Sequence, residues 1–193
     1  MKKNTYIIIC EGSSETAYIQ ELNKYMREND INLNLYPKSI GNGHYAEIIK
    51  KYKKEYSSNK KSKFIIWIDK DIYIRNENGN MDKYLSKPTN IPDFKFNMCN
   101  FEDFIVLHCD DTTIYNWQNI CNNKNHFKVP LQACNYEPLF ENNVINNYEK
   151  GSFPFNEINK ELLDKAIENN NNKNIKFKSD FLSFLENEIK NNV

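Results

Sequence analysis

Acidic side chains that follow two apolar runs are the residues of this sequence best suited to chemistry. Glu11 and Glu15 stand four residues apart after the first run, and Asp69 and Asp71 form a DxD after a later one. The i,i+4 spacing puts the two glutamates on one helix face, and period-two geometry at a strand end points the two aspartates to one side. Carboxylates this close repel one another unless a cation neutralises them, and an all-oxygen set favours Mg²⁺ or Mn²⁺ over zinc or copper. These four acids therefore predict a divalent-metal site suited to phosphoryl transfer.

A structural role for these acids is the alternative. Acids after strands are common as helix caps and turn formers, and a lone DxD is a weak signal. The combination is more specific, because strand, EGxxE and helix come first and strand and DxD follow about sixty residues later.

Strands and helices must bring these acids together. Apolar or alternating runs predict strands at residues 5–10, 32–40, 64–68 and 94–98. Helical periodicity predicts helices at residues 13–27, 45–56, 101–108, 112–122, 137–148, 156–168 and 179–190. Residues 72–91 are expected to cross the surface without a regular period, and the asparagine tract 169–172 is expected to be a loop.

This alternation indicates an α/β fold with a mainly parallel four-stranded sheet flanked by helices and a C-terminal helical extension. Ligands of such sheets bind at the carboxyl ends of the strands, where the four acids are expected to meet. We expect an α/β core at residues 1–110 and a helical region packed on it at 111–193. The C-terminal helices are expected to close the flank of the sheet or to form a homo-oligomer contact.

Composition sets the wider limits. The chain has 193 residues, which suits one domain, and its 13% aromatic content supplies a core despite a mean hydropathy of −0.78. Lys and Arg number 26, as do Asp and Glu, so a nucleic-acid partner must be held by a local patch. The five cysteines form no CxxC pair, which argues against a disulfide framework or a zinc knuckle and favours the cytoplasm. No run approaches a membrane span or a signal peptide.

A basic run on and after the second predicted helix offers a track for a phosphate backbone. Its lysines are Lys50, Lys51, Lys53, Lys54, Lys60, Lys61 and Lys63. Tyr52 and Tyr56 are interleaved and could stack on bases. A solvated helix end, where lysine also favours the helix dipole, is the more frequent role of such a run.

Other residues near the expected site are interpreted one by one. The Gly41–His44 loop could offer backbone N–H groups to a phosphate, with a plain turn as the alternative, and His44 could act as a general base or contact a phosphate. Glu102 could be a further ligand, an acid beside the metal, or a helix cap. His108 is expected in the core, and His126 has no context. Cys10 is expected in the core, and Asp103, Asp110 and Asp111 are expected to be surface or cap residues.

Two stretches, IIICEGSSE at residues 7–15 and FIIWIDKD at 64–71, resemble the TOPRIM domain of topoisomerases, primases and OLD-type nucleases. NFEDFIVLH at 100–108 is similar to a stretch of the RloB-like branch, which comprises bacterial proteins linked to phage defence. The resemblance covers about residues 5–110 and implies a TOPRIM-like fold. It also implies that Glu11, Asp69 and Asp71 are metal ligands and catalytic carboxylates, and Glu15 matches the second glutamate of the EGxxE form.

Three functions follow as expectations. The first is a Mg²⁺- or Mn²⁺-dependent nuclease that hydrolyses RNA, for example tRNA, or DNA in anti-phage defence. The second is a non-catalytic TOPRIM-fold module that binds nucleic acid or a partner protein within a defence complex. A phosphatase-like DxD enzyme is weaker, because such enzymes place the DxD after the first strand and expect Thr or Val after it, where this chain has Ile72 and Tyr73.

Overall fold

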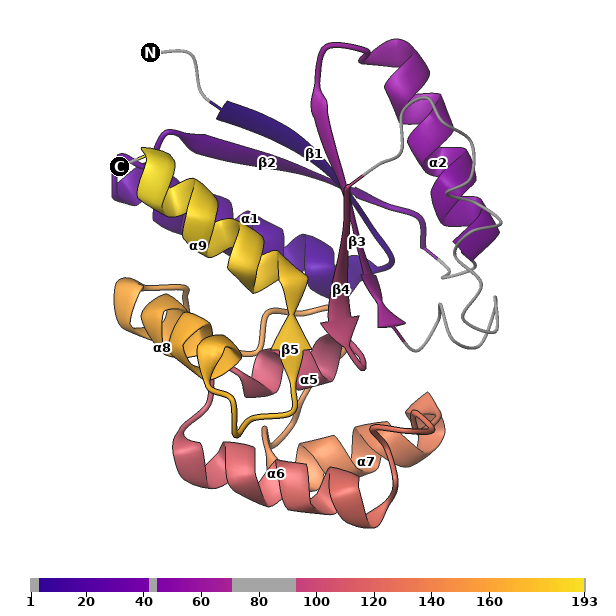
Figure 1. Ribbon diagram of the computed structural model, residues 1–193, viewed down its shortest axis with the longest axis vertical. Coiled ribbons are helices and arrows are strands. Elements are labelled where there is room, and N and C mark those ends of the chain that lie inside the picture. Colours follow the sequence, from indigo (N-terminus) through magenta and orange to yellow (C-terminus); the bar gives the residue numbers. More distant parts are fainter. Residues whose placement is uncertain (1–3, 42–44, 71–92, 193) are drawn as a thin grey trace.

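A five-stranded sheet forms the centre of the molecule in the computed structural model, which describes residues 4–41, 45–70 and 93–192 (Figure 1). The strand order is β2-β1-β3-β4-β5, with the first four strands parallel and β5 antiparallel to β4. The strands are β1 (Asn4–Cys10), β2 (Leu33–Ser39), β3 (Lys63–Asp69), β4 (Asp93–Met98) and β5 (Lys178–Ser179). The predicted α/β class with a mainly parallel sheet is confirmed. Asp71, His44 and the stretch 72–91 lie outside the described residues.

Both faces of the sheet are covered, which explains the continuous apolar runs at residues 6–10 of β1 and 64–68 of β3. Successive side chains enter different cores: Ile8 and Trp67 belong to the larger cluster, whereas Ile9 and Ile66 belong to a smaller one. All four are fully buried. A continuous apolar run, rather than alternation, is what a strand between two helical layers requires.

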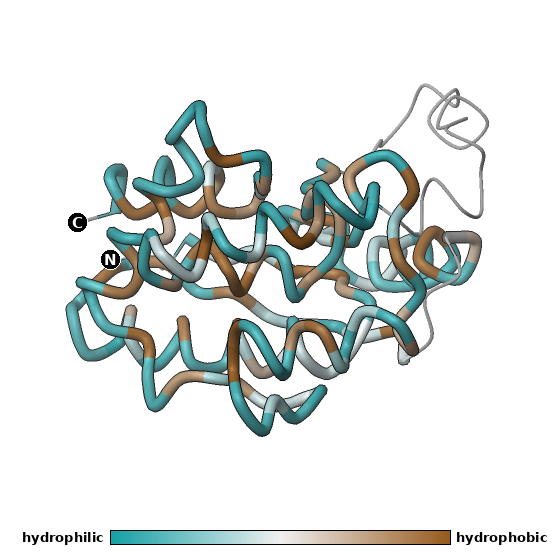
Figure 2. The backbone as a smooth tube through the Cα atoms, turned by 90° about the horizontal axis from the view of Figure 1, so that it is seen from below, coloured by the Kyte–Doolittle hydropathy of each residue, from teal (hydrophilic) through white to brown (hydrophobic). Residues whose placement is uncertain are grey.

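Helices build the two layers, with α2 on one face and α1 and α9 on the other (Figure 1). Their bounds are α1 (Ser13–Glu28), α2 (Tyr45–Ser58), α5 (Phe101–Val106), α6 (Asp111–Asn123), α7 (Ala133–Asn143), α8 (Lys160–Asn171) and α9 (Asp180–Asn192). Hydrophobic and hydrophilic stretches alternate along the helices, as expected when each helix buries one side (Figure 2).

The C-terminal helices share the core of the sheet. Trp117 of α6 and Phe140 of α7 belong to the same buried cluster as Ile8 of β1. Phe181 of α9 stacks on Trp67 of β3 with ring centroids 4.0 Å apart. One continuous core therefore runs from the strands into the region after residue 110.

Several details differ from the sequence expectations, among them the end of α7 at Asn143 rather than 148 and the start of α8 at Lys160 rather than 156. The sheet has five strands rather than four. The additional strand, β5, is only two residues long and has no periodicity from which the sequence could predict it. Helix α7 begins at Ala133 instead of 137, with Pro138 inside it, where proline is uncommon. The asparagine tract is helical up to Asn171, because these side chains bond to backbone groups: Asn169 Nδ2 donates to the Leu107 carbonyl at 2.8 Å and Asn170 Oδ1 accepts from Ser179 N–H at 2.7 Å.

Among the helices of the described ranges, none combines the length and the apolar character that a membrane crossing needs.

Candidate functional site

Three of the four predicted metal ligands meet at the carboxyl edge of the sheet. Glu11 follows β1, Glu15 lies in the first turn of α1 and Asp69 ends β3. Each offers a carboxylate oxygen, and these oxygens all lie within 4.8 Å of one another. Their all-oxygen donor set fits Mg²⁺ or Mn²⁺. The fourth, Asp71, lies outside the described residues.

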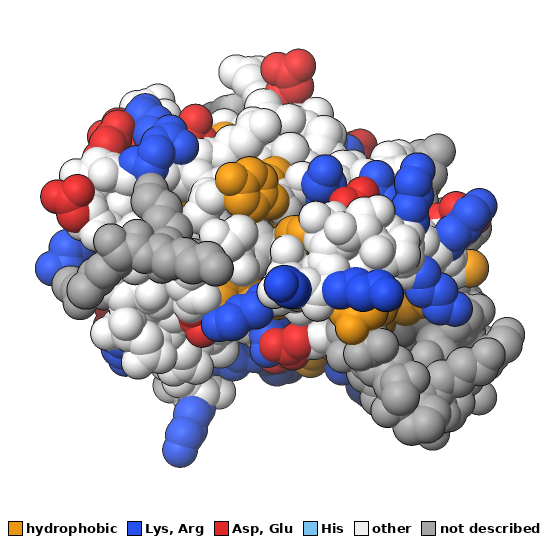
Figure 3. All heavy atoms as spheres, turned by 90° about the horizontal axis from the view of Figure 1, so that it is seen from above, with side chains coloured by type: hydrophobic (Ala, Val, Ile, Leu, Met, Phe, Trp, Pro, Cys, Tyr) orange, Lys and Arg blue, Asp and Glu red, His pale blue; other side chains and the backbone are white. Residues whose placement is uncertain are grey.

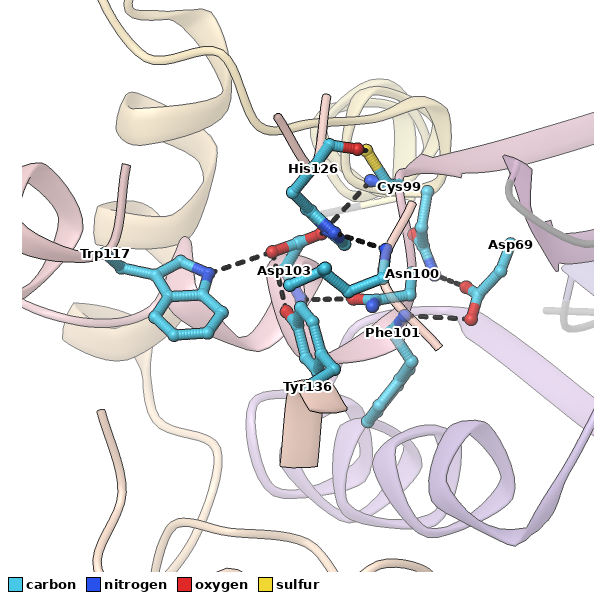
Figure 4. A network of polar contacts seen from close by, with 10 residues as sticks. Asp69, Cys99, Asn100, Phe101, Asp103, Trp117, His126 and Tyr136 are labelled. Atoms are coloured by element: carbon cyan, nitrogen blue, oxygen red, sulfur yellow. Dashed lines mark hydrogen bonds and ion pairs between the residues drawn. The ribbon is translucent and has the colours of Figure 1, made fainter. Parts of the chain in front are cut away.

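Asp69 is held by two hydrogen bonds from the neighbouring strand and its helix. Asn97 Nδ2 donates to Asp69 Oδ1 at 3.1 Å, and the backbone N–H of Phe101 donates to Oδ2 at 2.9 Å (Figure 4). The amide of Asn97 is itself oriented, because its Oδ1 accepts from Trp67 Nε1 and Ser179 Oγ, each at 2.9 Å. The two-residue strand β5 thus fixes, through Ser179 and Asn97, how Asp69 faces the site.

Glu15 has a raised pKa, as expected of a buried carboxyl group that would be stabilised by a bound cation. Its Oε2 accepts from Gly12 N–H at 3.2 Å, and only 4% of the residue is exposed. Burial, reinforced by the nearby charge of Glu102, raises the pKa of Glu15 to about 7. Burial also raises the pKa of Glu102. In the absence of a cation, burial therefore favours the protonated, uncharged form of these two carboxyl groups.

A pocket of about 400 Å³ opens beside the carboxylates. Glu11, Glu15, Asp69 and Glu102 line it, together with the start of α1, the end of β2 and Lys150. Glu102 therefore forms part of the wall, while Asn100 caps α5 by accepting from Asp103 N–H at 3.0 Å.

Lys150 brings a positive charge to this acidic pocket from the region after residue 110. The next residue, Gly151, has φ of +93° and donates its N–H to Ser14 Oγ at 3.0 Å. A Cβ at Gly151 would approach Ser13 Oγ to 2.7 Å, so both the conformation and the contact require glycine there. The turn that carries Lys150 is thereby fastened to the start of α1.

The charge on Lys150 is maintained by its surroundings. Partial burial acts to lower its pKa, but the net effect is a raised pKa, because Glu137 accepts from Nζ at 2.9 Å and Glu102 and Glu11 are nearby. The sequence reasoning missed Lys150. The one signal was Gly151, since the chain has only five glycines.

A family model described as RloB-like protein matches residues 6–183. The chain belongs to the RloB-like family. Searches of curated proteins and of solved structures found no match. The family match runs from β1 into α9 and so includes Lys150 as well as the acids.

A second group of potential ligands in this RloB-like chain has a different character. Cys99, Asp103 and His126 each offer an atom within 4.8 Å of the others, and all three are buried. The N–H of Leu131 donates to His126 Nδ1 at 2.9 Å, so the ring proton is on Nε2, which donates to Asp103 Oδ2 at 2.9 Å. A metal on Nε2 would require that proton to move to Nδ1, where it would face the Leu131 N–H. This arrangement disfavours a metal.

Asp103 is instead a fully bonded acceptor in the core. Its Oδ1 accepts from Trp117 Nε1 at 2.9 Å and from Tyr136 Oη at 2.7 Å, and its Oδ2 also accepts from Cys99 N–H at 3.3 Å (Figure 4). The expectation that Asp103 is a surface or cap residue is wrong. Its position at a helix start made it look like a cap, but three of its four donors, Trp117, His126 and Tyr136, come from segments after α5.

The expectations for His108, Cys10 and Asp110 are confirmed. His108 is a core histidine, as expected: Tyr18 Oη donates to its Nε2 at 3.0 Å, and burial lowers its pKa to about 4. Cys10 is fully buried, and Asp110 caps α6 by accepting from Thr113 N–H at 2.9 Å.

The basic run lies along α2 and the turn after it. Lys50, Lys53 and Lys54 are exposed and Lys51 is half-buried. Tyr52 is only 7% exposed and packs with Tyr56 against Phe64, so the expectation that these tyrosines could stack on bases is wrong for Tyr52.

Proposed function

We propose that this RloB-like protein is a Mg²⁺- or Mn²⁺-dependent nuclease with a TOPRIM-like core, acting in the cytoplasm in defence against phage. The observation that carries the proposal is the approach of Glu11, Glu15 and Asp69 carboxylate oxygens to within 4.8 Å of one another beside an open pocket. RNA, including tRNA, and DNA are both candidate substrates. A partner protein or a second copy of the chain could take part in the complex.

A divalent cation held by these carboxylates would polarise a phosphodiester and lower the pKa of a water. The chain's own groups have separate tasks. Glu11, Glu15 and Asp69 supply the ligand oxygens, and we expect Asp71 to join them. Asn97 and the Phe101 N–H keep Asp69 turned toward the site.

Lys150 has the charge and the position to contact a phosphate oxygen. It lines the same pocket as the acids, and its turn is anchored on α1. Charge that develops on a phosphate during hydrolysis is stabilised by a fixed cation. The turn after α7 therefore gives the C-terminal region a part in the proposed reaction.

Cleavage assays test the proposal directly. Purified protein is incubated with total tRNA, single-stranded RNA and plasmid DNA, with Mg²⁺, with Mn²⁺ or with EDTA, and cleaved ends are sequenced. We expect cleavage with metal and none with EDTA. In parallel, Mn²⁺ should raise the melting temperature, since a ligand at a hundred times its Kd stabilises the folded state by about 2.7 kcal/mol. Stabilisation by Mn²⁺ without cleavage of any substrate would favour the non-catalytic module.

A further inference from the structure

Two segments of this neutral chain carry positive charge and no acidic residue. Residues 112–136 contain Lys124 and Lys128, and residues 169–179 contain Lys173, Lys176 and Lys178. Neither segment contains Asp or Glu, although the whole chain has 26 acidic residues. A local excess of one sign attracts a polyanion even when the net charge of a chain is zero. This attraction requires that the two segments lie together.

Hydrogen bonds hold these two segments side by side. Gln118 of α6 accepts from the Lys176 N–H at 2.7 Å and donates from Nε2 to the Asn174 carbonyl at 3.2 Å. Lys176 Nζ donates to Asn122 Oδ1 at 2.6 Å. The loop between α8 and β5 therefore lies along the C-terminal half of α6 (Figure 1).

The loop between α8 and β5 is held in place by hydrogen bonds and a ring contact. Lys178 Nζ donates to the carbonyls of Asn170 and Asn172 at 2.6 and 2.8 Å. Partial burial lowers the pKa of Lys178, so this lysine has a structural part. Lys176 Nζ lies 5.3 Å from the centroid of the Phe127 ring, in the segment after α6. A surface held in this way loses little conformational entropy when it binds a ligand.

The other four lysines are exposed, and we call them the basic surface: Lys124, Lys128, Lys173 and Lys176. Within residues 4–41, 45–70 and 93–192, no carboxylate lies within ion-pair distance of any of the four. The face at the opposite end of the molecule from α6 is different, because Lys and Arg side chains are interspersed there with Asp and Glu (Figure 3). The basic surface therefore concentrates charge of one sign.

The basic surface begins close to the carboxylate site. Ser179 Oγ donates to Asn97 Oδ1, and Asn97 Nδ2 donates to Asp69. Lys176 is three residues before Ser179, so their Cα atoms are at most about 11 Å apart. The phosphates of one strand recur about every 3.4 Å along a duplex. A strand with one phosphodiester at the site can therefore reach Lys176 within a few nucleotides.

One more lysine lies at the edge of the sheet, next to the site. Lys70 directly follows Asp69, and its Nζ is 3.3 Å from the Sδ of Met98. Met98 of β4 pairs with Lys178 of β5. Positive charge therefore continues along this edge from Asp69 to the loop that carries Lys176.

We propose that the basic surface binds the phosphate backbone of a nucleic acid whose neighbouring phosphodiester lies at the carboxylate site. Lysine and asparagine are among the side chains that contact phosphates, and the exposed Asn123 and Asn125 flank Lys124. Contacts to phosphates carry no sequence information, so binding should depend on charge and salt rather than on the bases. The inference rests on the proposed nuclease for its substrate class, but its test is a binding measurement.

Salt-dependent binding tests the basic surface. A labelled single-stranded RNA of about twenty nucleotides is titrated in EDTA, where no cleavage is expected, at several KCl concentrations. Two double variants each remove the charge from one segment: Lys124→Ala with Lys128→Ala, and Lys173→Ala with Lys176→Ala. Each neutralised phosphate contributes about 0.7 to the slope of log K against log salt. Each double variant should therefore lose about 1.4 from the slope and bind about tenfold to a hundredfold more weakly at low salt.

Two controls separate charge from structure. Arg27→Ala with Lys160→Ala is the matched double variant, since both side chains are exposed and lie at the ends of α1 and α8 that are remote from the site and the basic surface. It should keep the wild-type slope. Arginine at all four positions of the basic surface should also keep the slope, because the charge is retained.

Duplex DNA and polyglutamate identify the kind of polyanion. If the surface accepts duplexes, the double variants should lose about 0.9 from the slope for each phosphate of duplex DNA, whereas an effect with RNA alone assigns the surface to single strands. Slopes that stay at the wild-type value in both double variants would overturn the proposal. So would displacement of the RNA by polyglutamate at an equal concentration of charge, because the surface would then fit an acidic protein.

Failure of this surface and failure of the nuclease are distinguishable. Metal-dependent cleavage by the wild type, with full binding by both double variants, refutes the surface and leaves the nuclease standing. Binding that depends on the four lysines, without cleavage of any substrate, supports the surface and refutes the nuclease.

Discussion

The carboxylate of Asp103 and the group formed by Glu11, Glu15 and Asp69 both contact the segment from Asn97 to Asp103 or its neighbours, and they differ in what stabilises them. Asp103 collects four hydrogen bonds from an indole, a phenol, an imidazole and a backbone N–H. Glu11, Glu15 and Asp69 bring three carboxylates together at a pocket instead. The first arrangement uses neutral donors and needs no ion. The second concentrates negative charge and is stabilised when a cation or a proton binds to it.

The two groups are joined through one short segment. Cys99 N–H donates to Asp103, and two residues later Phe101 N–H donates to Asp69. Asp103 therefore helps to fix the backbone that orients a proposed metal ligand. The comparison predicts that substitutions at the pocket reduce activity with little loss of stability, and that substitutions at Asp103 reduce stability first.

The largest expected effect is on activity, from Glu11→Gln. This change keeps the size of the side chain and removes a charge that would position the cation. We expect hydrolysis to fall about a thousandfold, which corresponds to roughly 4 kcal/mol of transition-state stabilisation. Cleavage rates and melting curves measured together in EDTA and in Mn²⁺ check it. A variant that cleaves like wild type would remove Glu11 from the mechanism.

Asp103→Ala should have the largest effect on stability, because it leaves the buried donors of Trp117, Tyr136 and His126 without their acceptor. Loss of one partner from a buried charged network costs about 3–5 kcal/mol. Urea unfolding measures it, and Asp111→Ala is the control, since that exposed aspartate forms only a surface ion pair with Lys165. If both variants unfold at the same urea concentration as wild type, Asp103 does not have the structural role assigned to it.

The same contrast shows what the sequence can and cannot predict. Strands β1 and β3, and the acids after them, could be predicted because continuous apolar runs identify buried strands and parallel topology places their ends together. Each apolar run identifies one strand, and only the general rule of parallel topology relates the ends of different strands to one another in space. It placed Glu11, Glu15 and Asp69 at one edge, where the structure finds them.

Partners from distant segments could not be predicted in this way. Asp103 and His126 are 23 residues apart and meet only after α6 has folded back, and Lys150 enters the pocket through a turn held by Ser14. Neither contact follows from hydrophobic periodicity. Tyr52 was misjudged for a related reason, because a tyrosine between lysines on a helix looks the same in sequence whether its ring faces the sheet or solvent.

Lys150→Met tests whether the cation in the pocket acts on substrate. We expect cleavage to fall about tenfold to a hundredfold, because a fixed charge near the phosphate would be lost. Stability should change little, because its half-exposed ion pair with Glu137 contributes about 0–1 kcal/mol. Lys150→Arg should retain most activity. Glu137→Gln is the matched control, since it removes the partner and leaves the lysine charge. Equal loss in Glu137→Gln and Lys150→Met would indicate that the ion pair, rather than the charge, is what matters.

A pH dependence of stability is expected to originate at Glu15. Its pKa is about 7 in the folded protein against an ordinary value of 4.5, so between these values the folded state holds a proton that the unfolded state has released. The stabilisation is complete below about pH 4.5 and is lost as pH rises toward 7, by at most about 1.4 kcal/mol per pH unit for one proton. Urea unfolding in EDTA at pH 5, 6, 7 and 8 measures it. Glu15→Gln cannot titrate, so the wild type should lose stability relative to this variant as the pH rises. Metal binding should strengthen over the same range, because the cation competes with the proton. Parallel stability profiles for the two proteins would mean that Glu15 is already ionised at pH 5 and that its carboxylate is accommodated like Asp103, without need of a cation.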